Sequence, residues 1–222
     1  MSLSIFDVTG PVMIGPSSSH TAGAARLARV ARTLAGAPFT HVSFGLHGSF
    51  HDTYLGHGTD KALLAGALGI REDDEALQNA PALAKEAGIT YDYSRADLAD
   101  MHENSVEITF RMTKGEPFTV VGSSIGGGQI VIRRVGDMET EFTANLPTLL
   151  VQHLDRRGMI SDISSLLTGA GINIAVLRHT RRAKGCYACT VAEVDEPIPP
   201  LVVQTIRSLS DVYSAQAVSI AN

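Results

Sequence analysis

The chain has 222 residues and a mass of 23.5 kDa, with 44% hydrophobic and 18% charged residues, a net charge of -5 and a pI near 5.9. These values are typical of a globular chain with one or two cores; they exclude a disordered chain and argue against nucleic acid as the main partner. No apolar run approaches the ~20 residues that span a bilayer, and the first residues show no secretory signal, so we expect no membrane anchor and a cytoplasmic location.

The chain contains only two cysteines, Cys186 and Cys189. They exclude a disulfide framework, and they cannot supply the three or four thiolates of an iron–sulfur cluster. Their spacing resembles a redox or metal pair, but residues three apart on a strand point to opposite faces of the sheet. We therefore expect no metal site within this chain alone.

A glycine and polar stretch at 135–141, followed by 145–147, indicates a domain boundary near residue 143. Six of the eight histidines precede it. The sequence thus predicts an α+β protein with two domains, residues 1–143 and 144–222.

Residues 1–143 predict a mixed α/β domain from their hydrophobic periodicity. In chain order, the expected elements are a helix with the apolar face Leu27, Val30, Ala31 and Leu34, a strand at 39–46, a helix at 61–68, a weaker helix between 74 and 87 that Pro81 interrupts, and strands at 106–112, 118–124 and 129–135.

Residues 144–222 predict the order βαββαβ. The expected elements are a strand at 148–154, a helix at 160–170, strands at 172–180 and 187–194, a helix at 200–209 and a strand at 212–220. This order is typical of the ferredoxin-like fold, an antiparallel sheet with both helices on one face.

Two polar motifs stand immediately before predicted helices. They are the run Ser17–Thr21 and the turn Gly56–Asp60. Helix N-termini offer free N–H groups and a partial positive charge, so a carboxylate or phosphate could bind at either motif. The same hydroxyls could instead only cap the helices.

The segment Met101–Asn104 adds a third histidine and an amide, and Gly126–Gly128 would let backbone approach a ligand or simply form a hairpin turn.

These motifs, in this order, resemble the bacterial iron–sulfur-dependent L-serine dehydratases. Four segments are similar to the β portion of that family: Gly15–Thr21, Gly56–Ala62, Met101–Asn104 and Ser124–Gly128. Residues 144–222 resemble an ACT domain through the turn Asp155–Gly158 and the entry to the second strand at 171–174.

The resemblance implies a lyase that converts L-serine to pyruvate and ammonia, within amino-acid catabolism and gluconeogenesis. In the two-subunit form, a separate α subunit holds the 4Fe-4S cluster, which would polarise the substrate hydroxyl while a histidine takes the α-proton. The implied catalytic residues are His20, His57, His102 and Asn104. The implied substrate-binding residues are Ser17, Ser18, Ser19, Thr21, Thr59, Asp60, Gly126 and Gly127. Asp60 could orient His57 or only cap the helix.

The ACT resemblance implies an effector site at Asp155, Gly158 and Asn173 for L-serine or a related amino acid, and a homodimer formed through this domain. A second resemblance supports an alternative. The same pair of domains is similar to the regulatory region of one class of D-3-phosphoglycerate dehydrogenases, which would make the chain a non-catalytic amino-acid-sensing module. A stand-alone sensor is a third interpretation.

Overall fold

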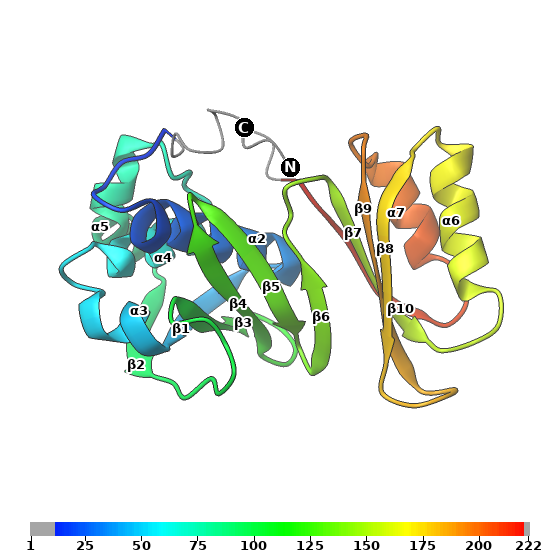
Figure 1. Cartoon of the computed structure of the whole chain (residues 1–222), viewed down its shortest axis with the longest axis horizontal. Helices are drawn as coiled ribbons and strands as arrows, with labels where there is room; N and C mark the ends of the chain where they lie inside the picture. The colour runs from blue at the N-terminus through cyan, green and yellow to red at the C-terminus, as the bar shows by residue number, and fades with distance from the viewer. Residues whose placement is uncertain (1–11, 220–222) are drawn as a thin grey trace. The chain divides into compact units, whose positions relative to one another are not determined.

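The computed structural model describes residues 12–219 and divides the chain into two compact units, Met1–Gly136 and Asp137–Asn222 (Figure 1). The boundary predicted near residue 143 lies a few residues later. The polar stretch at 135–141 is not a linker, because it contains most of strand β6 (Met138–Phe142), in which buried and more exposed residues alternate. Such alternation is typical of a half-buried strand.

The first sheet has six strands in the order β2-β1-β3-β4-β5-β6. Five of them are β1 (Phe39–Leu46), β2 (Thr90–Arg95), β3 (Ser105–Met112), β4 (Phe118–Gly126) and β5 (Gln129–Val135). Strand β1 pairs parallel with β2 and antiparallel with β3. The predicted strands are confirmed, and β2 is an additional edge strand that is polar and mostly exposed.

The helices of the first unit are η1 (Ser18–Gly23), α2 (Ala24–Ala35), α3 (Gly48–Thr53), α4 (Thr59–Leu68), η2 (Glu75–Asn79) and α5 (Ala80–Glu86). The predicted face of α2 is confirmed, because Leu27, Val30, Ala31 and Leu34 are all buried. Pro81 lies in the first turn of α5, where its missing N–H has no helical partner to lose, and it does not interrupt the helix.

Helices α2 and α4 pack at unusually close range. A Cβ on Gly66 of α4 would overlap the carbonyl oxygen of Ala25 in α2 and lie 2.8 Å from Ala28 Cβ. The contact between the two helices therefore requires glycine at position 66.

The second unit contains β7 (Thr148–Leu154), α6 (Met159–Gly169), β8 (Ile174–Arg181), β9 (Tyr187–Val194), α7 (Pro200–Arg207) and β10 (Val212–Val218). Its antiparallel sheet has the order β10-β7-β9-β8, with both helices on one face (Figure 1). This topology confirms the ferredoxin-like prediction. No helix within residues 12–219 is long and apolar enough to cross a membrane.

Candidate active site

His20 lies in η1, a π-helical turn that runs directly into α2. The N–H groups of Thr21 and Ala22 both donate to Ser17 O, at 2.9 and 3.3 Å, so this turn is wider than an α-helical turn. Ser17 Oγ accepts from the His20 N–H at 3.1 Å. Ser17 thus caps the helix, a role that the sequence interpretation allowed for the hydroxyls of this run. His20 lies in the wide turn that follows.

The imidazole of His20 is held at both ring nitrogens by serine hydroxyls. Nε2 lies 3.1 Å from Ser49 Oγ, and Nδ1 lies 3.3 Å from Ser19 Oγ. The Phe50 ring packs edge-on against it, with 5.3 Å between ring centroids. Burial lowers the pKa of His20, the nearby His57 lowers it further, and a hydrogen bond with Ser49 opposes both effects. The ring is therefore neutral near pH 7 and able to accept a proton.

The second predicted motif meets the first. The rings of His20 and His57 have their centroids 4.8 Å apart, and Thr21 Oγ1 donates to His57 O at 3.0 Å. Thr59, at the start of α4, is fully buried. The carbonyl of Asp60 accepts from Tyr93 OH at 2.7 Å, whereas no hydrogen bond joins its carboxylate to His57 among the described residues.

The third motif, Met101–Asn104, makes backbone hydrogen bonds to β4 and to α3, the helix that carries Ser49. Asn104 O accepts from the Ser124 N–H at 2.9 Å, and Glu103 O accepts from the Phe50 N–H at 3.3 Å. His102 is exposed, and its Nδ1 accepts from the Asn104 N–H at 3.0 Å. The structure therefore brings His20 and His57 together, and it connects Met101–Asn104 to the helix that carries Ser49 rather than to the histidine rings.

Two buried hydroxyls beside η1 and α4 have no hydrogen-bond partner among the described residues, those of Thr59 and Ser124. A Cβ on Gly23 would overlap Ser124 Oγ, so this approach depends on glycine. An unsatisfied buried hydroxyl costs about 1–3 kcal/mol, so each of these two groups calls for a partner such as water or a ligand. The sequence predicted Thr59 but not Ser124 as a binding residue.

The glycines Gly126, Gly127 and Gly128 all have positive φ, at 98°, 60° and 75°, and connect β4 to β5. A Cβ on Gly126 or Gly127 would meet nothing within 4 Å. The hairpin interpretation accounts for all three glycines, and Gly126 and Gly127 remain predicted substrate contacts.

The cysteines do not fit an iron–sulfur cluster. Cys186 is exposed and Cys189 is buried in β9, where burial raises the pKa of the Cys189 thiol to about 12. A protonated, buried thiol is a poor metal ligand. Within residues 12–219, no three or more His, Cys, Asp or Glu side chains are grouped to hold a metal ion.

In the second unit, Asp155 braces the β8–β9 hairpin. Its carboxylate accepts from the Gly185 N–H at 3.0 Å and from Arg181 Nη1 at 2.9 Å, and these two bonds lower the pKa of Asp155. Gly158 has a φ of 85° and directly precedes α6. The Asp155 carboxylate is thus already bound by its own chain.

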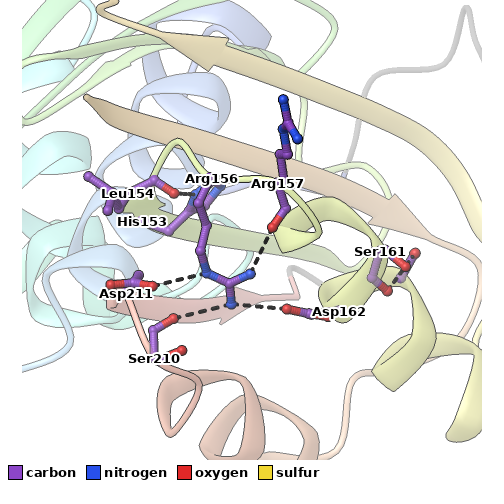
Figure 2. A network of polar contacts seen from close by, with 9 residues as sticks. His153, Leu154, Arg156, Arg157, Ser161, Asp162, Ser210 and Asp211 are labelled. Carbon is purple, nitrogen blue, oxygen red and sulfur yellow. Dashed lines mark hydrogen bonds and ion pairs between the residues drawn. The ribbon is translucent and has the colours of Figure 1, made fainter. Parts of the chain in front are cut away.

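Arg156, inside the predicted effector turn, holds three segments of the second unit together (Figure 2). Its guanidinium donates to Asp211 Oδ2 and to Asp162 Oδ2, both at 3.0 Å, and to the carbonyls of Arg157 and Ser210. The sequence did not predict this role, because neither acidic partner lies within the turn.

Asn173 lies at the other end of this sheet. Its Nδ2 donates to Asp195 at 2.6 Å and its N–H to Glu196 at 2.7 Å. Since β7 and β8 each pair antiparallel with β9, they run parallel to one another. Asp155 follows the end of β7 and Asn173 precedes the start of β8, so one strand length of roughly 20 Å separates them.

A buried polar chain crosses the same sheet. His153, fully buried, places Nδ1 2.8 Å from Leu154 O and Nε2 2.9 Å from Thr190 Oγ1, which in turn lies 3.0 Å from His179 Nδ1. A carbonyl can only accept, so His153 Nδ1 carries the proton and, in the neutral ring, Nε2 accepts from Thr190. Thr190 then accepts from His179, and every group is satisfied while His153 is neutral.

We expect the second unit to lose stability as the pH falls below about 6.5. Burial lowers the pKa of His153, so the unfolded chain binds a proton that the folded unit excludes, and the free energy of unfolding decreases as the pH falls. Urea unfolding at pH 7.5 and 5.5 should differ by on the order of 1 kcal/mol more in the wild type than in His153→Gln. His51→Gln is the control, and an equal pH dependence in all three proteins would contradict this prediction.

The protein therefore has a first unit in which serine hydroxyls and His57 surround His20, and a second unit with a ferredoxin-like fold. A family model for the serine dehydratase beta chain matches residues 4–91. The chain is 40% identical to the "L-serine dehydratase, beta chain" of Peptoniphilus asaccharolyticus over 98% of both proteins. It is 38% identical to the "Probable L-serine dehydratase, beta chain" of Bacillus subtilis, over 97% of this chain and 98% of that protein. This chain belongs to the serine dehydratase beta chain family, as the sequence motifs predicted.

D-3-phosphoglycerate dehydrogenase of Mycobacterium tuberculosis is 28% identical over 68% of this chain, but over only 29% of its own length. The regulatory-module alternative is not favoured, because the two beta chains are more similar to this chain and match it over nearly their whole length. Among solved structures, the ACT domain from GTP pyrophosphokinase of Chlorobium tepidum is 15% identical, with a TM-score of 0.27, and the match covers 32% of this chain and 95% of that domain.

Proposed function

We propose that this chain is the β half of an L-serine dehydratase that is active only with a separate α chain, and that the pair converts L-serine to pyruvate and ammonia. The observation that carries the proposal is the contact between the two predicted motifs, with the His20 and His57 rings 4.8 Å apart. The reaction would belong to amino-acid catabolism in the cytoplasm, with pyruvate available for gluconeogenesis.

In this proposal His20 is the general base. Its lowered pKa keeps the imidazole neutral. With Nε2–H donating to Ser49, the lone pair is on Nδ1, where the substrate would displace the longer Ser19 contact and give up its α-proton. His57, exposed beside it, would contact the substrate or the α chain. His102 is less suited to the role, since it is exposed and lies outside the contact between the His20 and His57 rings.

The substrate carboxylate and ammonium need polar partners that have no other role. The unpartnered hydroxyls of Thr59 and Ser124 meet this requirement, and the Asn104 amide is a further proposed contact. The remaining proposed contacts are Ser17, Ser18, Ser19, Thr21, Asp60, Gly126 and Gly127.

We expect the purified chain to bind no iron–sulfur cluster, and to support serine deamination when mixed with a cluster-bearing α chain. The physical reason is that the chain has only two cysteines, fewer than a cluster needs, and that one of them, Cys189, is buried with a protonated thiol. Anaerobic reconstitution followed by iron and sulfide analysis tests the first part, and a pyruvate assay tests the second. A stoichiometric cluster in this chain alone, or no activity with any amount of cluster-loaded α chain, would contradict the proposal.

We also propose that the second unit pairs with a second copy and binds L-serine or a related amino acid between the copies. Asp155–Gly158 and Asn173 lie at opposite ends of the sheet, so one small ligand can contact both only when they come from different chains. Asn173 lines a hollow of about 390 Å³ together with Thr168, Gly171, Ile172 and Ile174.

Replacing Asn173 by alanine should weaken L-serine binding to this dimer about tenfold, the effect of one lost hydrogen bond. Calorimetry on the full chain measures it, with sedimentation to establish the dimer. Identical heats for wild type and Asn173→Ala would leave the second unit as a dimerisation element only.

A further inference from the structure

Ser49 reaches His20 from a separate element. It lies in α3, 29 residues along the chain, with its Oγ 3.1 Å from His20 Nε2. By contrast, Ser19 is the neighbour of His20 in the wide turn, and its hydroxyl also lies 3.4 Å from Ser17 Oγ. Among residues 12–219, Ser49 is the one side chain outside η1 that hydrogen-bonds to the imidazole.

The helix that carries Ser49, α3, is fixed to the segment 103–105 by backbone hydrogen bonds before and after Ser49. The His47 N–H donates to Ser105 O at 3.0 Å, and the Phe50 N–H donates to Glu103 O at 3.3 Å. Gly48 has a φ of 51°, and a Cβ there would overlap the Glu103 side chain. Thr53 Oγ1 donates to Ser49 O at 2.8 Å. The Ser49 hydroxyl is therefore presented from a rigid position at the start of β3.

A hydroxyl on Nε2 suits a base that changes its protonation state. Ser49 can accept from Nε2–H both in the neutral ring, whose lone pair is then on Nδ1, and in the imidazolium, so one contact holds the ring before and after Nδ1 takes the proton. A carboxylate at the same place would raise the pKa of the ring, so that more of it would already be protonated at neutral pH.

We propose that Ser49 is the positioning residue that fixes the ring orientation of His20 for proton abstraction, an inference that rests on the proposed function. The backbone contacts of α3 hold the Ser49 hydroxyl in place, and this hydroxyl holds Nε2 of His20. The backbone of η1 holds the Cα end of the His20 side chain. The segment Met101–Asn104 contributes indirectly, because Glu103 holds the helix that carries Ser49.

The test uses three variants of the full chain: Ser49→Ala, Ser49→Thr, which keeps the hydroxyl, and Ser43→Ala. Ser43 is the matched control, since its Oγ lies 3.1 Å from Nε2 of another histidine, His41. The readouts are the imidazole ¹⁵N shifts of His20 across a pH titration of the chain alone, and kcat and KM with the α chain. Circular dichroism establishes that each variant is folded.

We expect Ser49→Ala to change the His20 shifts and titration, to lower kcat about tenfold and to leave KM within twofold. Ser49→Thr should restore both readouts and Ser43→Ala should change neither. Unchanged His20 shifts in Ser49→Ala would overturn the inference whatever the activity. Normal kcat in Ser49→Ala beside an inactive His20→Ala would overturn the inference alone, whereas normal kcat in His20→Ala would overturn the proposed base and the inference with it.

Discussion

Replacing His20 by alanine should lower kcat for serine deamination by about 10² to 10⁴ when the chain is assayed with its α chain. The variant removes the imidazole that both Ser19 and Ser49 hold, and no other described ring occupies that position between the two hydroxyls. The kinetic signature is a fall in kcat with little change in KM, because a general base acts in the transition state.

His41→Ala is the matched control for this experiment. His41 also has a serine hydroxyl 3.1 Å from Nε2, but it pairs with Asp92 and Thr90 on β2 and contacts none of the three motifs. The control should retain kcat, and both variants should keep the circular dichroism spectrum of the wild type. If His20→Ala kept kcat within threefold while His57→Ala lost it, the base would be His57.

Replacing Gly66 by alanine should lower the free energy of unfolding by about 1–3 kcal/mol, the usual cost of overpacking. The added methyl would overlap a main-chain carbonyl of α2, and a backbone cannot rotate away as a side chain can. Urea unfolding measures the loss, and amide hydrogen exchange in α2 and α4 locates it.

Gly169→Ala is the corresponding control. Gly169 also lies in a helix, α6, but a Cβ there meets nothing within 4 Å. Alanine has the higher helix propensity, so this variant should be neutral or stabilised by up to about 1 kcal/mol. Equal stability of Gly66→Ala and the wild type would show that the two helices can separate without cost.

The elements with a strong hydrophobic period could be predicted from the sequence almost to the residue. The strands at 39–46 and 148–154 are confirmed with the same bounds, because apolar side chains mark the buried face of each. The elements that were missed lack that mark. Strand β2 is a polar edge strand, and α3 has six residues and one buried side chain, Phe50. Strand β6 does alternate, but its glutamates and the preceding glycine are typical of a linker.

The sequence indicates candidate site residues, which stay predictions, but not the contacts that connect them. Local motifs indicate His20 and His57, since glycines, hydroxyls and imidazoles before a helix have few structural uses in combination. Ser49 and Ser124 carry no such signal, because a lone serine is common and their roles depend on long-range packing. In the second unit, the partners of Asp155 lie 26 and 30 residues away, and the acidic partners of Arg156 lie 6 and 55 residues away, so their engagement could not be read from the turn.

The wide turn at η1 joins the serine run and His20, which are proposed to act on the substrate, to the packed helix α2. An α-helical turn would span the same part of the helix with one residue fewer. Removal of one residue there would let α2 continue in regular register back to Ser17, and the residues inside the turn, His20 among them, would change the side of the helix that they face. The face formed by Leu27 and Val30 would still pack, while the serine run would turn away from His57. A homologue with a single-residue gap at this point would keep the domain and lose the alignment that the chemistry requires.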